Sequence, residues 1–464
     1  MEKILSIIKK YIPKKIFKLL QPIYHYFMAW LAAFFYGFPS EKIIVIGVTG
    51  TTGKTTSTYL IAETLKGAGY KVGYTSTAMF NNGKKEWLNN KKMTMVGRFF
   101  TQKMLKDMVK NKCHFAIIET TSEGVVQFRH RFINYDFLVF TGLYPEHIES
   151  HGSFENYKKA KGRLFSHLKQ CKYKFVDENY HIVRPKNEIK KIELQRVKKT
   201  TILNGDDQHV KYFFDFWADK KVVFVNRAEK FDGSAEWLRY KDVKTGEKGI
   251  GFAVNGENIN LRLLGEFNAV NAMTAYALAY SLSVKKEDIK KGLEKVDGVA
   301  GRLEKIDEGQ NFIAIVDYAF EPNAVQNLYK TIKMIPHHKI IHLLGSTGGG
   351  RDVARRPVLG EIAGKNADIV IVTNEDPYDD DPVLIIDQVA LGAEKKGKIL
   401  NKNLFKIEDR REAIKKAIKM AKEKDIVLIT GKGSEQAICL KNGEKMPWDD
   451  RAVVRGVLHS LRKT

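Results

Sequence analysis

The sequence is poor in cysteine, and its few cysteines are scattered. Cys113, Cys171 and Cys439 form no C-x-x-C pair and no even framework. Disulfide scaffolds and zinc ribbons both need several cysteines at defined spacings, so both are excluded. The pattern indicates a protein of a reducing cytoplasm.

Acidic residues are also in deficit. Aspartate and glutamate number 54 against 78 lysines and arginines, which gives a formal net charge of +24. Such a balance favours anionic partners: nucleic acid, a membrane surface, or phosphorylated and carboxylated substrates. The basic residues are dispersed, however, and no basic motif interleaved with aromatic residues is present. We therefore expect no nucleic acid partner, and a nucleic-acid-binding NTPase is only a distant alternative.

The chain has no long hydrophobic run. The uncharged stretch between Pro22 and Pro39 would form a helix of about 24 Å, which is shorter than the roughly 30 Å hydrocarbon core of a bilayer. It follows a basic amphipathic segment, and no small-residue cleavage site comes after it, so a removed signal peptide is not indicated. We expect residues 1–38 to lie on the inner face of a membrane or to dock on the protein itself, with a true span as a third alternative.

What is present is the composition and pattern of a globular α/β protein. The 464 residues exceed one core, and 44% of them are hydrophobic. From residue 42 apolar runs alternate with helical patterns, as in a parallel sheet covered by helices. We expect strands at residues 42–48, 114–120 and 136–143 and a helix at residues 55–69. Residues 171–199 are lysine-rich and are expected to be irregular.

A second break near residues 297–306 precedes another set of strands and helices. No repeat of 20 to 50 residues is visible. We predict three segments. They are a basic, aromatic helical segment over 1–40, a P-loop central domain with a parallel-rich sheet over 41–298, and a Rossmann-like α/β domain over 299–464.

The stretch GVTGTTGKTT, residues 47–56, lies between an expected strand and an expected helix. In that context backbone N–H groups and the helix N-terminus bind phosphates, a lysine neutralises them and a hydroxyl reaches Mg²⁺. The strict P-loop spacing fails, because Val48 stands five residues before Gly53. The candidate nucleotide-binding residues are Gly50, Thr51, Thr52, Gly53, Lys54, Thr55 and Thr56.

This variant spacing resembles the Mur ligase family, ATP-dependent enzymes that form amide bonds by activating a carboxylate. The resemblance covers nearly the whole chain. HFAIIETTSEGVVQFRHR, TGLYPEHIESHGSFENYKKAKGRLF and GEFNAVNAMTAYA follow in the family's order, as do GRLEKI, VDYAFEPNA, GSTGGGRDVARRP, TNEDPYDDDP and ITGKGSEQ. Within the family the spacing is most similar to the UDP-N-acetylmuramoyl-tripeptide synthetase type, which adds the third amino acid of the peptidoglycan stem peptide.

The resemblance implies a cytoplasmic, monomeric ligase with ATP and Mg²⁺ as cofactors and a UDP-N-acetylmuramoyl-peptide-like carboxylate and an amino acid as substrates. Glu119, His147 and Thr55 would hold Mg²⁺, and Lys161 would be carbamylated; with Lys54 these are the catalytic candidates. Without the resemblance, Lys161 would be expected in solvent. Asn268 and Asn271 would bind adenine. Arg302 and Asp317 would contact phosphate and ribose. The implied substrate residues are Thr94, Ser122, Arg129, Arg351, Asp376, Tyr378, Gly431 and Glu435.

Several departures put the substrate in question. The 46 residues before the loop cannot form the domain that grips the UDP group in this type. Tyr378 stands where enzymes that use meso-diaminopimelate have arginine, so that amino acid is not supported. Glu375 and Asp376 suit a cationic amine such as lysine, or belong to a solvated acidic loop. Other departures are Phe320 and Glu321 for His-Thr, Ser434 for histidine, and an altered Thr-Thr-Pro near Thr94.

The departures leave alternatives open. One is a ligase of the same fold with another carboxylate, such as a folate or a polypeptide. A scaffold that has lost catalysis is another, against which the intact candidate residues Lys54, Thr55, Glu119, His147 and Lys161 speak.

Overall fold

The computed structural model describes residues 14–146, 148–183, 194–231, 233–350 and 353–462. Their contacts divide the chain into two compact units. Unit 1 comprises residues up to 86, 93–239 and 273–289, and unit 2 comprises residues 87–92, 240–272 and 290 onward. Because the units interleave along the chain, the predicted domain limits stay a prediction.

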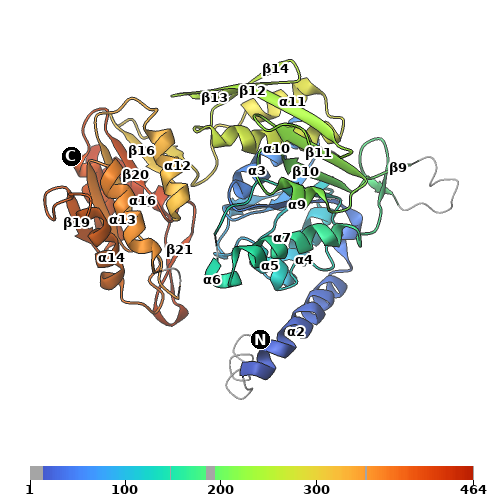
Figure 1. The fold of residues 1–464 in the computed structure, drawn as a ribbon, viewed down its shortest axis with the longest axis horizontal. Coiled ribbons are helices and arrows are strands. Elements are labelled where there is room, and N and C mark those ends of the chain that lie inside the picture. Colours follow the sequence, from blue (N-terminus) through green and yellow to red (C-terminus); the bar gives the residue numbers. More distant parts are fainter. Residues whose placement is uncertain (1–13, 147, 184–193, 232, 351–352, 463–464) are drawn as a thin grey trace. The chain divides into compact units, whose positions relative to one another are not determined.

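Unit 1 is built on a sheet that is parallel at its centre (Figure 1). The strand order is β11-β10-β6-β1-β5-β2-β3, and only β3 runs antiparallel to its neighbour. All six residues of β1 are buried. The bounds are β1 (Ile44–Thr49), β2 (Val72–Thr75), β3 (Met79–Asn81), β5 (Phe115–Glu119), β6 (Phe137–Phe140), β10 (Thr200–Asn204) and β11 (Lys220–Val225), with β4 (Glu86–Leu88) beyond β3.

The register of this sheet fixes the position of the site. Val48 pairs with Glu119 and Thr49 with Phe140. Because parallel strands end at the same edge, the loops after β1, β5, β2 and β6 lie together. The unit's helices are α3 (Lys54–Gly67), α4 (Arg98–Lys110), α5 (Ser122–Val126), α6 (Ile148–His151), α7 (Phe154–Leu168) and α9 (Val210–Phe214), with the short helix η1 (Pro39–Lys42).

The predicted α/β class and the expected strands and helix are confirmed, with bounds that differ by one to three residues. The segment expected to be irregular differs in part. It contains a small sheet of two-residue strands, β7 (Phe175–Val176), β8 (Ile182–Val183) and β9 (Gln195–Arg196).

Helix α2 (Lys14–Phe35) packs on unit 1 through one face. Ala29, Ala32 and Ala33 are buried there, and α2 contacts α4. The opposite face carries the aromatic stripe, which we define as the exposed residues Leu20, Ile23, Phe27, Trp30 and Phe34. These recur at helical spacing, so they share one side of α2. No helix within the described ranges is long and apolar enough to cross a membrane.

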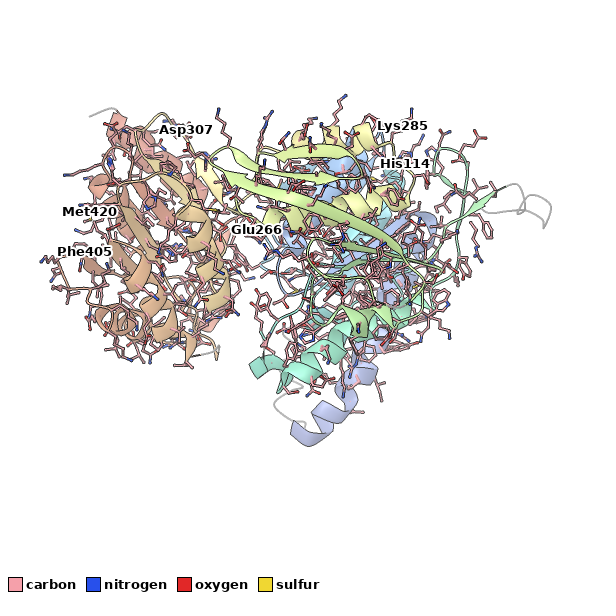
Figure 2. The ribbon with its side chains drawn as sticks, turned by 45° about the horizontal axis from the view of Figure 1, so that its top comes forward. His114, Glu266, Lys285, Asp307, Phe405 and Met420 are labelled. Atoms are coloured by element: carbon pink, nitrogen blue, oxygen red, sulfur yellow. The ribbon has the colours of Figure 1, made fainter. Side chains whose placement is uncertain are left out.

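Unit 2 contains a six-stranded sheet of order β15-β16-β20-β17-β18-β19, parallel except for β15. One buried cluster lies under α12, α13 and α14, and a second under α15 and α16. Phe405 and Met420, labelled in Figure 2, pack at the margin of the second cluster. A Cβ on Gly360 of α13 would lie 1.8 Å from the Val389 carbonyl oxygen, so only glycine permits the close packing of α13 on α14.

The strands of this sheet are β15 (Glu304–Ile306), β16 (Ile313–Val316), β17 (Ile340–Leu344), β18 (Ile369–Thr373), β19 (Leu404–Ile407) and β20 (Ile426–Ile429). Its helices are α12 (Pro322–Ile332), α13 (Arg355–Asn366), α14 (Pro382–Glu394), α15 (Arg410–Met420) and α16 (Asp450–Arg462). The small elements that follow β20 are β21 (Ala437–Cys439), η2 (Lys441–Gly443) and β22 (Lys445–Pro447).

Some elements belong to both units. β12 (Glu236–Gly246) pairs with β11 through residues 236–239 and then continues into unit 2, where it pairs with β13, which in turn pairs with β14. α10 begins in unit 2 and ends in unit 1. The bounds are β13 (Gly249–Val254), β14 (Glu257–Leu261), α10 (Phe267–Ser281) and α11 (Lys286–Glu294).

Candidate active site

The loop after β1 wraps the N-terminus of α3. A Cβ on Gly50 would lie 2.0 Å from the Thr141 hydroxyl, so the loop packs against the end of β6 only with glycine there. Thr141 donates to the Thr52 carbonyl at 2.6 Å, and the Thr51 N–H to the Gly142 carbonyl at 2.8 Å. The first N–H groups of α3, from Lys54 and Thr55 onward, are therefore presented at a rigid loop, as phosphate binding requires.

Glu119, the last residue of β5, is held by three donors of unit 1. The Thr55 hydroxyl lies 3.1 Å from Oε2 of Glu119, and the Thr77 N–H and hydroxyl donate to the carboxylate at 2.7 and 3.0 Å. Glu119 is only 1% exposed. The structure thus brings together two of the three predicted metal ligands, a hydroxyl and a carboxylate, which are the hard oxygen donors that suit Mg²⁺.

Lys161, on α7, is buried against the same loop. Its Nζ donates to the Gly50 carbonyl at 2.7 Å and lies 4.7 Å from the centroid of the Tyr157 ring. Burial and the neighbouring Lys54 ammonium lower the pKa of Lys161 well below its ordinary value. Lys161 therefore has neutral-amine character and lies inside the site, not in solvent. Lys54 itself donates to the carbonyls of Gly50 and Thr51 at 3.2 and 2.6 Å.

Three predicted substrate residues lie near this edge of unit 1. The Thr94 hydroxyl lies 2.9 Å from the Thr77 hydroxyl, to which it can donate while Thr77 donates to Glu119, so it joins the Glu119 network. Ser122 begins α5, and its hydroxyl lies 3.0 Å from Nε2 of His151. Arg129 donates to the Gln127 side chain at 2.6 Å and to the Met95 carbonyl.

The predicted adenine residues lie one turn apart on α10. Asn271 donates to the side-chain oxygen of Asn268 at 2.8 Å, and Asn268 donates to the Leu264 carbonyl at 2.7 Å. Both are buried. Their amides thus form one connected group, which can bind as a unit.

Asp317 follows β16 in unit 2. Its two oxygens accept from the N–H groups of Leu303 and Ala319, each at 2.7 Å. Burial raises the pKa of Asp317, against the opposing charge of Arg302. The Arg302 guanidinium lies 4.3 Å from the centroid of the Tyr318 ring. Asp317 therefore orders the backbone beside Arg302, and Arg302 is stacked and oriented.

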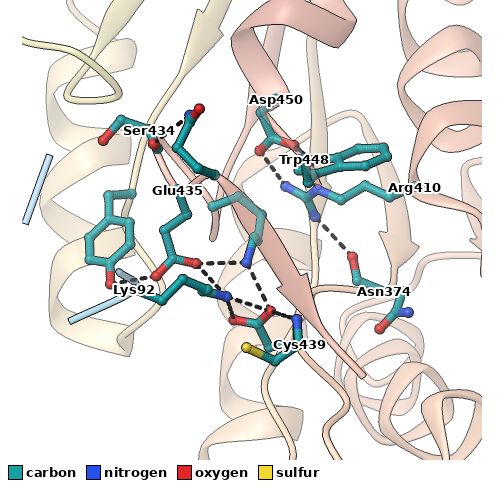
Figure 3. Close-up of polar contacts among 12 residues, drawn as sticks. Lys92, Asn374, Arg410, Ser434, Glu435, Cys439, Trp448 and Asp450 are labelled. Carbon is teal, nitrogen blue, oxygen red and sulfur yellow. Dashed lines mark hydrogen bonds and ion pairs between the residues drawn. The ribbon is translucent and has the colours of Figure 1, made fainter. Parts of the chain in front are cut away.

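The predicted amino-acid-selecting residue Asp376 lies in a charged cluster of unit 2. Figure 3 labels two other members of the cluster, Lys92 and Glu435. Its carboxylate accepts from Lys92 Nζ at 2.6 Å and from Lys432 Nζ at 2.9 Å. Glu435 accepts from the same two lysines, at 3.0 and 2.6 Å. Burial opposes ionisation of Asp376, but the two lysines lower its pKa overall. Two cations balance two anions, so no charge is left to attract a cationic amine.

Glu375 is buried as well, with 3% exposure, which contradicts the interpretation of Glu375 and Asp376 as a solvated acidic loop. Burial, then the charge of Asp376, raises the pKa of Glu375 to about 7. A Cβ on Gly431 would lie 2.3 Å from Oε2 of Glu375. The suggestion of lysine selection rested on Glu375 and Asp376 with Asp379 to Asp381 nearby. Asp376 is already paired with two lysines, and the choice of amino acid stays a prediction.

Tyr378 has a left-handed backbone, with φ of 52°, and its ring is close to Gly349, where a Cβ would lie 2.9 Å from it. Its neighbourhood is supported by the buried ion pair of Arg410 with Asp450, in which Arg410 also donates to the Asn374 and Thr430 carbonyls at 3.1 and 2.8 Å. Those contacts fix the strand ends that carry the cluster.

Two predicted site residues, His147 and Arg351, lie outside the described residues. The structure places four further residues in the site that are not among the predicted ones: Thr77, Tyr157, Lys92 and Lys432. Lys432 and Tyr157 could have been found, because they lie within the motifs ITGKGSEQ and TGLYPEHIESHGSFENYKKAKGRLF. Thr77 and Lys92 carry no local signal.

Comparisons with known proteins agree with this geometry. A family model described as the Mur ligase middle domain matches residues 48–194 and 181–279, and one described as the Mur ligase glutamate ligase domain matches residues 301–433. A UDP-N-acetylmuramyl-tripeptide synthetase of Roseiflexus sp. is 36% identical over 440 residues, 94% of this chain and 82% of that protein. A UDP-N-acetylmuramoyl-L-alanyl-D-glutamate–2,6-diaminopimelate ligase of Geobacillus kaustophilus is 34% identical over 435 residues, covering 93% and 82%.

Solved structures are similar along most of the chain. A UDP-N-acetylmuramoyl-L-alanyl-D-glutamate–2,6-diaminopimelate ligase matches with a TM-score of 0.57 and 26% identity, over 91% of this chain and 80% of that one. A folylpolyglutamate synthase of Mycobacterium tuberculosis has a TM-score of 0.63 at 15% identity, covering 94% and 93%, which is a likeness of fold alone.

Proposed function

The chain belongs to the Mur ligase family, and from this membership we propose that it joins the amine of an amino acid to the carboxylate of a UDP-N-acetylmuramoyl peptide in peptidoglycan synthesis, with conversion of ATP to ADP and phosphate. The observation that carries the proposal is the phosphate loop of unit 1, where Thr55, Glu119 and the buried Lys161 converge. A monomer is proposed as the working form.

The reaction needs a leaving group on the carboxylate. A carboxylate oxygen attacks the γ-phosphorus of ATP, and the bond between the γ-phosphorus and the oxygen that bridges it to the β-phosphate breaks. The products of this step are ADP and an acyl phosphate. The amine then attacks the acyl carbon, the C–O bond to phosphate breaks, and the amine loses a proton. Bound ATP and Mg²⁺ supply the phosphoryl group and the neutralising charge; Thr55 and Glu119, with His147 as the further candidate, would hold the metal.

Lys161 is proposed to act as a carbamate. A neutral amine adds to CO₂ and loses one proton, which replaces a cation with an anion. The lowered pKa of Lys161 favours the neutral amine, and the position of its Nζ beside the Gly50 carbonyl places the new carboxylate at the phosphate loop. That anion would support the metal site, whereas an ammonium there would repel it.

In unit 2, Asn268 and Asn271 are proposed to bind adenine. Arg302 is proposed to bind phosphate, and Asp317 orders the backbone beside Arg302. Thr94, Ser122 and Arg129 are proposed for the carboxylate donor. The proposed residues for the amino acid are Arg351, Asp376, Tyr378, Gly431 and Glu435.

We further propose that the aromatic stripe of α2 rests on an anionic bilayer surface. Its five residues are 37% to 67% exposed on the face opposite the docked alanines. Between Glu2 and Glu41 the sequence has six lysines and no acidic residue. An apolar helix face beside a basic segment is the composition of an interfacial helix, and the charge suits anionic lipid.

The test of the catalytic proposal is an ADP-release screen of the purified protein, with each amino acid in turn, with and without UDP-N-acetylmuramoyl-dipeptide. ADP release that requires both the donor and one amino acid is expected, and Lys54→Ala should abolish it. Release that depends instead on a folate or polypeptide carboxylate, or no release with any pair, would refute the assigned donor.

A further inference from the structure

Two arginines of unit 1 are held side by side by one glutamine. Arg98 is the first residue of α4, and Arg129 follows α5. Arg98 Nη2 donates to the Gln127 carbonyl, while Nε and Nη2 of Arg129 donate to the Gln127 side-chain oxygen at 3.0 and 2.6 Å. Both guanidinium groups are thus anchored to the same residue, one at its backbone and one at its side chain.

Neither guanidinium forms an ion pair with any residue in the described ranges. Three buried arginines of the chain do so: Arg410 pairs with Asp450, Arg355 with Glu321 and Arg356 with Asp380. Arg98 and Arg129 are half-buried, and their acceptors are the carbonyls of Gln127 and Met95, the Gln127 amide oxygen and the sulfur of Met93. Their hydrogen-bond acceptors are therefore all uncharged.

The local field is positive for a second reason. Arg98 occupies the first position of α4, where the helix dipole is positive, and the first turn of α4 has no acidic residue. The N-cap, Gly97, offers no side-chain acceptor to the free N–H groups. An anion is favoured at such a helix end, and here it would also meet two guanidinium groups.

The electrostatics of the free protein agree. Burial, and then the charge of Arg129, lower the pKa of Arg98 to about 10. Burial also lowers the pKa of Arg129, against the opposing charge of Glu123. His25, on the docked face of α2, has its pKa lowered to about 4 by burial and by the two arginines, so it is neutral near pH 7. Two guanidinium ions therefore face one carboxylate, that of Glu123, with which neither forms an ion pair, and the group keeps a net positive charge.

We propose that Arg98 and Arg129 form a two-guanidinium site for one oxyanion of the carboxylate donor, either a phosphate or a carboxylate. This inference rests on the proposed function. The resemblance pointed to Arg129 alone, whereas the structure adds Arg98, which none of the matching motifs contains. Two planar guanidinium groups that donate to one anion are an arrangement that recognises phosphate and carboxylate.

The site lies beside α2. His25, on the docked face of α2, is near enough to both arginines for their charges to lower its pKa. Tyr26 of the same helix packs on Phe128 and Phe132 at centroid distances of 6.1 and 5.1 Å. α2 therefore flanks the segment that carries Gln127 and Arg129.

The test measures donor binding by calorimetry, without ATP or amino acid, so that turnover is not required. Wild type, Arg98→Ala and Arg98→Lys are titrated with UDP-N-acetylmuramoyl-dipeptide and with N-acetylmuramoyl-dipeptide, which lacks the phosphates. Lys103→Ala is the matched control, because Lys103 lies on α4 but is exposed and paired with Asp107. Thermal melting of each variant checks that it folds.

We expect Arg98→Ala to weaken donor binding about ten- to a hundredfold, Arg98→Lys to lie between it and wild type, and Lys103→Ala to have no effect. The KM for ATP should stay unchanged in all three variants. A loss confined to the phosphorylated donor identifies the anion as phosphate, and an equal loss with both donors identifies it as a carboxylate.

The inference is overturned if Arg98→Ala binds both donors as wild type does, or if folded wild type binds neither. Its failure is distinguishable from failure of the proposed function. A wild type that binds donor through Arg98 but releases no ADP with any amino acid refutes only the ligase activity. A wild type that is active and insensitive to Arg98→Ala refutes only the oxyanion site.

Discussion

The side-chain nitrogen of Lys161 lies 2.7 Å from the carbonyl oxygen of Gly50. A helix lysine 111 positions away from the phosphate loop is thereby buried against it, beside the lysine that neutralises the phosphates. This contact turns a residue that composition would place in solvent into part of the site, and it motivates the first prediction.

Lys161→Ala should lose most of its ADP-release activity, because the anion proposed at this position would be absent. Short carboxylates such as acetate or propionate should restore part of the rate by supplying that anion. Lys159→Ala is the matched control, since Lys159 lies two residues earlier on α7 and is exposed. A fully active Lys161→Ala variant would refute carbamylation.

Thr77→Val should raise the Mg²⁺ concentration needed for half-maximal ADP release by about tenfold. The substitution removes the hydroxyl that donates to Glu119 at 3.0 Å, and residues that orient a metal ligand affect metal affinity on this scale. Thr77→Ser keeps the hydroxyl and should behave as wild type. An unchanged Mg²⁺ requirement in Thr77→Val would separate Thr77 from the metal site.

Phe27→Glu with Phe34→Glu should release the protein from vesicles that contain anionic lipid, because charge on the aromatic stripe opposes insertion. ADP release should be retained. The matched control is Leu384→Glu with Leu391→Glu, which charges another exposed helix face, on α14. Cosedimentation measures binding. A double variant that binds vesicles as wild type does, or that changes only the oligomeric state, would contradict the membrane proposal.

Glu375→Gln should flatten the dependence of stability on pH. The folded state holds the Glu375 proton to about pH 7, against an ordinary pKa of 4.5. The contribution of Glu375 to stability is therefore complete below pH 4.5 and is lost as the pH rises to about 7, by about 3 kcal/mol in total.

Scanning calorimetry from pH 5 to 8 measures this difference. Above pH 7 Glu375→Gln should unfold at a higher temperature than wild type, and near pH 5 the two should converge. Glu444→Gln serves as the control because Glu444 is exposed. A constant offset between the variant and wild type across this range would show that Glu375 is ionised throughout.

The sequence predicted the elements that depend on contiguous patterns. Apolar runs such as residues 114–120 became β5, and the glycine spacing of residues 47–56 identified the loop at the N-terminus of α3. These signals are local, because a strand or a phosphate loop is encoded by neighbouring residues. The order of the motifs then indicated the family before any contact was known.

The sequence was less informative about what charged side chains do. It presented Glu375 and Asp376 as two acids side by side, with no sign that Lys92, 284 positions from Asp376, would neutralise one of them. It likewise left open whether residues 1–38 lie on a membrane, dock on the protein or span a bilayer. In the structure α2 is docked through one face and exposed on the other.

The sequence by itself determined the α/β class, the phosphate loop and the order of the catalytic motifs, because each is written in adjacent residues. Only the tertiary structure decided that Thr77 supports Glu119, that Lys161 is buried at Gly50, and that Gln127 holds Arg98 beside Arg129. The physical reason is that charge, burial and hydrogen bonding depend on distances between residues remote in the chain, and packing alone sets those distances.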